Sequence, residues 1–198
     1  MGRLILRSVM NIKDLINKLL PVDRLSMMSG EEIVEHIALH IYKDHFSDRR
    51  EHFEQLPEVL RDIILVIDLD TELNMNGITG YLENSSGCYF EETMETLERI
   101  QFREDLNIMK KIKTVLMTNG ISLQKLRGNR SSLTEYQISN FLETHGRTIS
   151  DVMDLIETEA EQLYLYHEEN NIFEYLFKYV EANKDKLILT SKTLKDGK

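Results

Sequence analysis

Helix breakers are rare in this chain, and their scarcity limits the fold more than any other feature. Two prolines and nine glycines occur in 198 residues. Because these are the residues that end helices, long uninterrupted helices are expected. No segment alternates apolar and polar residues as half-buried strands do. The sequence therefore predicts an all-α fold, a single globular bundle of about eight helices.

Local signals in the N-terminal half place the first helices. Apolar residues at helical spacing in 12–20 predict a helix that Pro21 ends. Ser29 followed by Glu32 matches a capping box and predicts the start of a second helix. The apolar run 63–67 is compatible with a buried strand, but the length and acidic flanks of the surrounding segment favour a central helix.

Similar local signals predict helices in the rest of the chain. Asn119 and Gly120 form a helix end signal, and residues 120–132 read as a basic loop, the one place where the chain could be divided. We expect one domain over residues 10–189, preceded by nine residues that are disordered or lie before the native start, and followed by a polar tail, 190–198. Further helices are predicted over 90–100, 104–117, 133–146, 148–170 and 172–187.

Composition narrows the function classes. The formal net charge of −10 argues against direct nucleic-acid binding, because phosphates would be repelled. It suits a cytoplasmic protein, or one with a basic partner. The single Cys88 excludes an intrachain disulfide and a multi-cysteine metal site. No apolar run approaches the roughly 18 residues of a membrane span. No membrane partner and no cofactor are predicted.

Two patterns are candidates for a metal-binding site or a catalytic nucleophile. His36, His40 and Asp44 recur on one helical face at a spacing that can hold a metal, but the segment HIALH lacks the glutamate of the zinc-protease motif. A solvated helix face is the expected alternative. Cys88 has no histidine near it in sequence, so a thiol packed as a small hydrophobe is expected there. No catalytic motif is found, and no enzymatic activity is predicted.

The stretch NMNGITGYLENSSGCYF, residues 74–90, is the least helical part of the sequence. It contains three glycines, three asparagines and adjacent serines. Gly77 and Gly80 can adopt backbone angles closed to other residues, and Asn84 can bond to nearby backbone groups. Tyr81 is expected to pack inward. We therefore interpret this stretch as a structural corner.

Acidic residues concentrate after residue 134. Residues 135–174 contain ten acids and one basic residue, Arg147. Ordinary exposed helix faces mix the signs of their charges, so this imbalance suits a basic partner, although the exposed side of an amphipathic helix is the plain alternative. On one long helix the acids would form a row roughly 20 Å long. The predicted partner-binding face comprises Asp151, Asp154, Glu157, Glu161 and Glu168.

An ordered set of residues spans positions 56–101. It consists of Leu-Pro, then an acid, then a glycine-rich segment that ends in an aromatic residue and an asparagine, then a serine-glycine turn and a helix. Pro57, Glu72, Gly77, Tyr81 and Asn84 occupy its positions. This pattern resembles the DNA-mimic protein 19 family, whose motif reads N-G-G-F-x-Q-[YF]-F-x-N after the acid. The similarity runs over about residues 56–183.

The chain departs from that family at several positions. Asn76 replaces the first glycine, Ile78 the phenylalanine, Gly80 the glutamine and Gln101 the glycine that follows the next helix. The resemblance implies an all-helical, often dimeric fold. It also implies an acidic, DNA-like surface, which the founding member presents to a DNA-binding protein.

Three functions follow from these patterns. The first is an acidic interaction module that occupies the basic surface of a nucleic-acid-binding partner, with an immunity-type inhibitor of a toxin or nuclease as a variant. The second is a small metal-dependent enzyme that uses the histidine face. The third is a dimerisation module, because five aromatic side chains exceed what one helix pair needs: Tyr164, Phe173, Tyr175, Phe177 and Tyr179.

Overall fold

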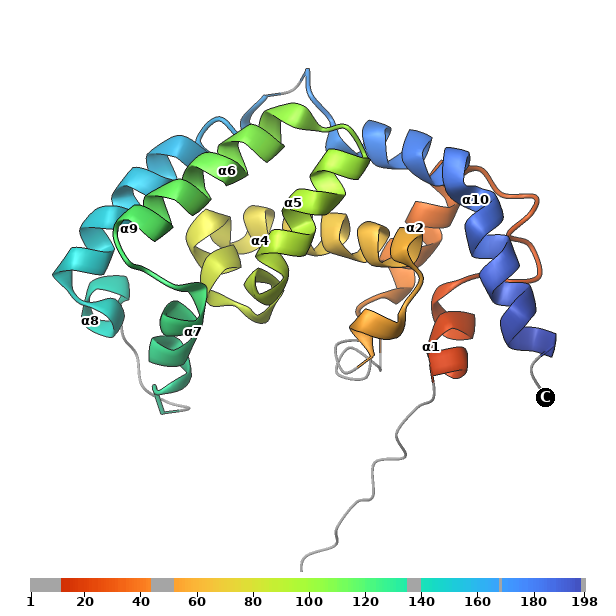
Figure 1. Cartoon of the computed structure of the whole chain (residues 1–198), viewed down its shortest axis with the longest axis horizontal. Helices are drawn as coiled ribbons and strands as arrows, with labels where there is room; N and C mark the ends of the chain where they lie inside the picture. Colours follow the sequence, from red (N-terminus) through yellow and green to blue (C-terminus); the bar gives the residue numbers. More distant parts are fainter. Residues whose placement is uncertain (1–11, 44–51, 135–139, 168, 197–198) are drawn as a thin grey trace, which may run out of the picture. The chain divides into compact units, whose positions relative to one another are not determined.

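The computed structural model describes residues 12–43, 52–134, 140–167 and 169–196, without the side chains of Tyr166 and of residues 190–196. These residues form helices joined by turns, and no strand occurs among them (Figure 1), which confirms the predicted all-α class. None of the helices in these ranges combines the length and apolar character needed to cross a membrane. The α-helices are α1 (Ile12–Leu19), α2 (Gly30–His40), α4 (Glu58–Glu83), α5 (Phe90–Arg99), α6 (Arg103–Thr118), α7 (Leu123–Ser131), α8 (Phe141–His145), α9 (Arg147–Ala160) and α10 (Ile172–Asp196).

The contacts within the chain divide it into two compact units. The first combines the chain up to Ile64 with the chain from Leu176 onward, and the second is Leu65–Tyr175. The boundaries fall inside α4 and α10, so neither coincides with a loop. The prediction of one domain over residues 10–189 stays a prediction.

In the first unit, the N-terminus of α2 lies against α10. Ser29 and Glu32 form the predicted capping box. The Gly30 N–H donates to the Glu181 carboxylate at 2.7 Å, and an added Cβ at Gly30 would collide with a backbone carbonyl oxygen of α10. Hydrogen bonds from Lys184 and from the Gly30 N–H lower the pKa of Glu181. A glycine is therefore required where the two helices approach.

Helix α4 contains the apolar run, and all five side chains from Ile63 to Ile67 are buried. The run is helical, so the helix interpretation is confirmed over the strand alternative. Pro57 lies directly before the helix, and its carbonyl oxygen accepts the Arg61 N–H at 2.9 Å. Proline is suited to this place because its missing N–H would have no partner in a first helical turn.

In the second unit, α6 packs beside both α5 and α9, and α8 packs against α7 and α9 (Figure 1). Leu97 of α5, Met109 of α6 and Ile156 of α9 are fully buried. Tyr81 is also buried, as predicted for the corner before α5, and so is Leu82.

Four predicted element bounds are wrong. The described part of the helix predicted over 133–146 is only α8, which begins at Phe141 after the Asn140 cap. Residues 123–131 of the predicted basic loop form α7, which begins after Ser122 caps the Lys125 N–H. The helix predicted over 148–170 ends at Ala160. Helix α10 continues to Asp196, through most of the segment predicted as a polar tail.

Two helices of the second unit end in the same hydrogen-bonding motif with different residues. After α6, Gly120 has a φ of 63°, and the Ile121 N–H donates to the Leu116 carbonyl oxygen at 2.9 Å. After α5, Gln101 has a φ of 64°, and the Phe102 N–H donates to the Leu97 carbonyl oxygen at 2.9 Å. This left-handed position favours glycine. Gln101 is where the family motif has a glycine, so the chain keeps the conformation without the residue that suits it.

Replacing Gln101 with glycine should therefore stabilise the protein by about 1 kcal/mol, because the left-handed conformation costs a residue with a Cβ about that much. The reverse change, Gly120→Gln, should destabilise by a similar amount, since a Cβ there meets no atom within 4 Å and only the backbone cost remains. Urea unfolding of both variants measures the two effects. Equal stability of Gln101→Gly and wild type would contradict the proposed strain.

Candidate functional site: the acidic face of α9

Helix α9 has a buried face and an exposed acidic face. Gly146, with a φ of 83°, separates it from α8. Asp151, Asp154 and Glu157 are exposed. The buried side comprises Ile149, Val152, Met153, Ile156 and Ala160, at the helical spacing expected for one apolar face.

The end of α9 is set by contacts with distant residues. Leu163 is extended and buried, and the Tyr164 N–H donates to the Asp105 carboxylate at 3.1 Å. The Tyr164 hydroxyl donates to Asp70. These contacts turn the chain away from the helix axis, so Glu161 is the C-cap of α9 and Glu168 lies outside the described residues. The acidic face is therefore shorter than the 20 Å row predicted from one long helix.

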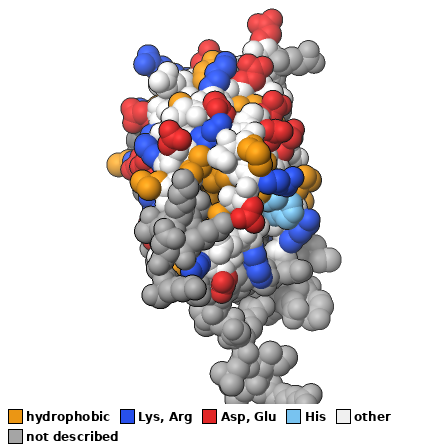
Figure 2. Space-filling model, turned by 90° about the vertical axis from the view of Figure 1, so that its right-hand side faces the viewer, with side chains coloured by type: hydrophobic (Ala, Val, Ile, Leu, Met, Phe, Trp, Pro, Cys, Tyr) orange, Lys and Arg blue, Asp and Glu red, His pale blue; other side chains and the backbone are white. Residues whose placement is uncertain are grey.

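Basic residues cover part of this face. Lys111 of α6 lies 3.1 Å from Glu159, and Arg147 lies 3.9 Å from Asp151. Asp154 and Glu161 form no ion pair with any described residue. The face thus keeps two exposed carboxylates without a basic neighbour in the described part of the chain. On the face drawn in Figure 2, by contrast, acidic and basic side chains are interspersed.

A small pocket adjoins the end of the acidic face. It has a volume of about 280 Å³ and lies between α9 and the bend of α4. Glu157 and Glu161 line it together with Leu73, Gly77 and Ile78. The Thr79 hydroxyl donates to the Glu157 carboxylate at 2.6 Å and fixes that side chain. The site therefore combines carboxylates with an apolar floor, a combination that suits the aliphatic stem and charged end of a lysine or arginine.

The family-motif residues build the support of this pocket. The Glu72 carboxylate accepts hydrogen bonds from Asn84 at 2.7 Å, from Asn76 at 3.1 Å and from Ser86 at 3.1 Å. Gly77 has a φ of 65° and interrupts α4 among these residues. The predicted structural corner is present, and Asn84 bonds to Glu72 rather than to the backbone.

Tyr81 anchors the same corner from inside. It is buried, and its hydroxyl donates to Thr93 Oγ1 at 3.0 Å. The Thr93 hydroxyl in turn donates to the Tyr89 carbonyl oxygen at 2.7 Å. Burial raises the pKa of the Tyr81 phenol. Cys88 is exposed, so the expectation of a packed thiol is wrong.

A buried ionisable pair, Glu83 and His145, was not predicted. His145 Nε2 donates to the Glu83 carboxylate at 2.5 Å, and Asn129 forms a hydrogen bond with His145 Nδ1 at 3.1 Å. Arg130 lies 3.4 Å from the other Glu83 oxygen. These contacts tie the end of α4 to α7 and α8. Because 62 positions separate the pair, no local sequence signal could have revealed it.

Asp105 is a second buried acid that was not predicted, and its carboxylate accepts a hydrogen bond from the Tyr164 N–H. Its side chain is 1% exposed, and its Oδ2 has no hydrogen-bond partner among the described residues. Burial raises the pKa of this carboxyl to about 7, and the hydrogen bond from Tyr164 opposes the rise. The charged form of Asp105 is therefore disfavoured in the folded protein.

The predicted histidine face does not have the geometry of a metal site. The His36 and His40 rings are stacked with centroids 4.2 Å apart, and His40 Nδ1 is hydrogen-bonded to the His36 carbonyl oxygen at 2.6 Å. Stacked rings direct their nitrogens in parallel rather than toward one ion. No group of three potential ligands occurs among the described residues, and Asp44 lies outside them.

The closing aromatic residues have contacts within their own units. Tyr179 donates to the buried Asp62 at 2.5 Å. Tyr175 packs edge-on against Phe102, with ring centroids 5.0 Å apart, and is 36% exposed. Burial, and after it the hydrogen bond to Asp70, raise the pKa of Tyr164. Each of these three aromatic residues therefore has a partner within its own unit, but only Tyr164 is buried, while Tyr179 is half-buried and Tyr175 is exposed. Dimerisation stays a prediction.

The fold and site define an all-α protein whose exposed acidic helix adjoins a bend held by a Glu72-centred network. A match to the family described as DMP19-like protein covers residues 54–183. The chain therefore belongs to the DMP19-like protein family, which confirms the resemblance drawn from residues 56–183. Comparison with curated proteins finds no match, and comparison with solved structures finds none.

Glu72→Gln should destabilise the protein by about 2 kcal/mol. The new amide nitrogen donates instead of accepting, so some of the three groups that donate to Glu72 lose their hydrogen bond. Glu98→Gln, at an exposed position of α5, is the matched control and should change the free energy of unfolding by less than about 0.5 kcal/mol. Chemical denaturation measures both. Equal effects at the two positions would contradict the role given to Glu72.

Asp105→Asn should change the pH dependence of stability. Between the unfolded pKa of 3.8 and the folded pKa of about 7, the folded state holds a proton that the unfolded state has lost. Wild-type stability should therefore fall relative to the variant as pH rises through this window, by on the order of 2 kcal/mol between about pH 5 and pH 7. Urea unfolding across this range measures it, with the exposed Asp154→Asn as control. Parallel profiles for wild type and Asp105→Asn would rule out the raised pKa.

Proposed function

We propose that this protein acts by binding rather than by catalysis, as a DNA-mimic-like protein that occupies the basic surface of a nucleic-acid-binding partner. One observation carries the proposal: Asp154 and Glu161 are exposed on one face and lack an ion pair within the described chain. Membership of the DMP19-like protein family supports it.

The energetic argument depends on where these carboxylates find counter-charges. In the free protein they are solvated, and their mutual repulsion is screened by salt. A basic partner would supply the missing positive charges and gain a faster association rate. The apolar residues of the pocket that Glu157 and Glu161 line would contact the stem of an inserted lysine or arginine.

The spacing of the charges limits the mimicry. Asp154 and Glu161 are seven residues apart, or roughly 10 Å along a helix, whereas one DNA strand carries a charge per roughly 3.4 Å. Helix α9 alone would therefore imitate a phosphate backbone sparsely. We infer that the partner contacts these carboxylates together with acidic residues of other helices, which form a patch rather than one row.

The test begins with the intact protein immobilised and exposed to a lysate of its native host. Bound proteins are eluted with rising salt and identified by mass spectrometry, and the partner is then purified. Duplex DNA should displace the purified partner from the protein, because a DNA mimic and DNA share one binding surface. A partner that DNA does not displace would overturn the mimicry.

The double variant Asp154→Lys and Glu161→Lys should weaken the complex at least about tenfold at low salt, with a smaller salt dependence, because attraction becomes repulsion at two positions. The control pair, Glu98→Lys and Asp185→Lys, changes two exposed acids elsewhere and gives the same net charge of −6 instead of −10. Isothermal titration calorimetry against the purified partner compares them. If both pairs weaken binding equally, net charge rather than the α9 face determines it.

A further inference from the structure

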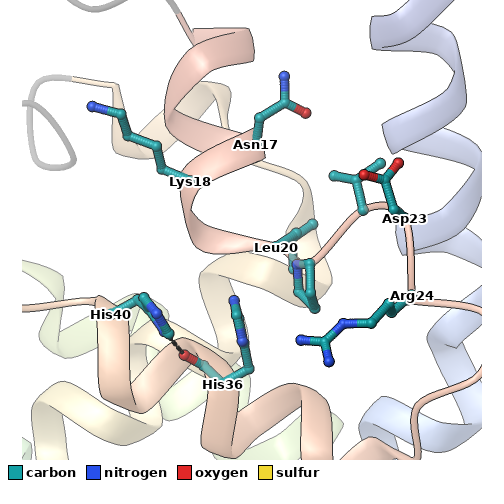
Figure 3. Close-up of a pocket in the computed structure, with 9 residues that line it drawn as sticks. Asn17, Lys18, Leu20, Asp23, Arg24, His36 and His40 are labelled. Carbon is teal, nitrogen blue, oxygen red and sulfur yellow. Dashed lines mark hydrogen bonds between the residues drawn. The ribbon is translucent and has the colours of Figure 1, made fainter.

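A pocket in the first unit gathers basic side chains in a chain whose net charge is −10. It has a volume of about 480 Å³ and lies between the end of α1, the turn that follows it and one face of α2 (Figure 3). Lys18 comes from α1, Arg24 from the turn, and His36 and His40 from α2. Asp23 is the acid among the lining residues.

Arg24, His36 and His40 approach one another inside this pocket, whereas the Lys18 side chain is directed away from them (Figure 3). Figure 3 shows the Arg24 guanidinium group pointing toward the His36 ring, with the Asp23 carboxylate turned away from the rings. The His36 carbonyl oxygen accepts from His40 Nδ1, so the Nε2 of His40 can donate to an anion only when the ring is protonated. An anion in the pocket would therefore meet the guanidinium fork of Arg24 on the turn and histidine rings on α2, which donate an N–H to it from a suitable tautomer or from the imidazolium form.

The surroundings of His36 show the cost of this arrangement. Burial lowers the pKa of His36, and His40, Arg24 and Lys43 lower it further through their positive charge. The neutral form of His36 is therefore favoured in the empty pocket. A bound anion would favour the protonated form and raise this pKa again.

We propose that this pocket binds the phosphate group of a small phosphorylated molecule. Arginine presents several donors in a planar fork that matches phosphate oxygens, and a tetrahedral dianion can also accept from the imidazoles. A phosphate alone does not fill 480 Å³, which lies in the range of pockets for small organic ligands. Leu20, Pro21 and Val22 line the pocket as well and would contact an apolar part of the ligand.

Phenyl phosphate is a suitable probe, because it joins a phosphate to an apolar ring. Titration into the full-length protein, followed by ¹H–¹⁵N correlation spectra, should give saturable shifts for residues 17–20 and 22–24 and for His36 and His40. Benzoate should bind at least about tenfold more weakly, since a planar monoanion forms fewer charge-assisted hydrogen bonds. Phenol should give no saturable shift.

Arg24→Gln removes the guanidinium group at an exposed position and should weaken phenyl phosphate binding at least about tenfold. Arg103→Gln, at an exposed arginine of α6 in the second unit, should leave it unchanged. Thermal unfolding verifies that both variants are folded, and the wild-type titration is informative without them. No saturable shift with about 10 mM phenyl phosphate, equal binding of benzoate, or unchanged binding to folded Arg24→Gln would each overturn the proposal.

Discussion

The Glu72 carboxylate holds the bend of α4, and the arrangement of the second unit depends on that bend. Glu72 lies five residues before the interruption at Gly77 and bonds to Asn84 and Ser86 beyond the helix end. The turn that it fixes, Ser85–Tyr89, contacts both α5 and α7. A carboxylate suits this place because it accepts several hydrogen bonds at once, and each is strengthened by its charge. The motif acid therefore acts as a structural clamp beneath the acidic face rather than as part of it.

Two departures from the family motif at this bend compensate each other. The family motif has glycine where this chain has Asn76 and glutamine where it has Gly80. An added Cβ at Gly80 would collide with the Cβ of Asn76, so the two positions cannot both carry side chains in this backbone. Here Asn76 supplies the polar group and donates to Glu72, while Gly80 makes room for it. In this chain the pair therefore carries one side chain, at position 76, and position 80 leaves the space that it occupies.

Sequence reasoning succeeded where the signal and its effect are local. The Ser29 capping box and the helix end at Gly120 depend on backbone groups within a few residues, so their patterns are readable without the fold. It failed where distant contacts override local preference. Nothing near Ala160 ends α9; the chain turns there because Asp105 and Asp70 bind Tyr164 from other helices. Of the candidate site, the exposed acids of α9 were predictable, whereas the pocket beside them and the Glu83–His145 pair were not.

Net charge is a poor guide to the binding surface, because many acidic residues are buried or paired in the fold. Asp62, Asp105 and Glu83 are buried and serve the fold through hydrogen bonds to Tyr179, Tyr164 and His145. Other acids are partly neutralised on the surface, as Glu159 is by Lys111. A charge that already has a partner gains little from a second one, because the desolvation cost of a new contact remains while most of the Coulombic gain has been used. A basic partner can therefore draw binding energy mainly from the carboxylates that the fold leaves exposed and unpaired. On α9 that selection leaves Asp154 and Glu161, which lie on one face beside a pocket, and this combination makes α9 the candidate surface.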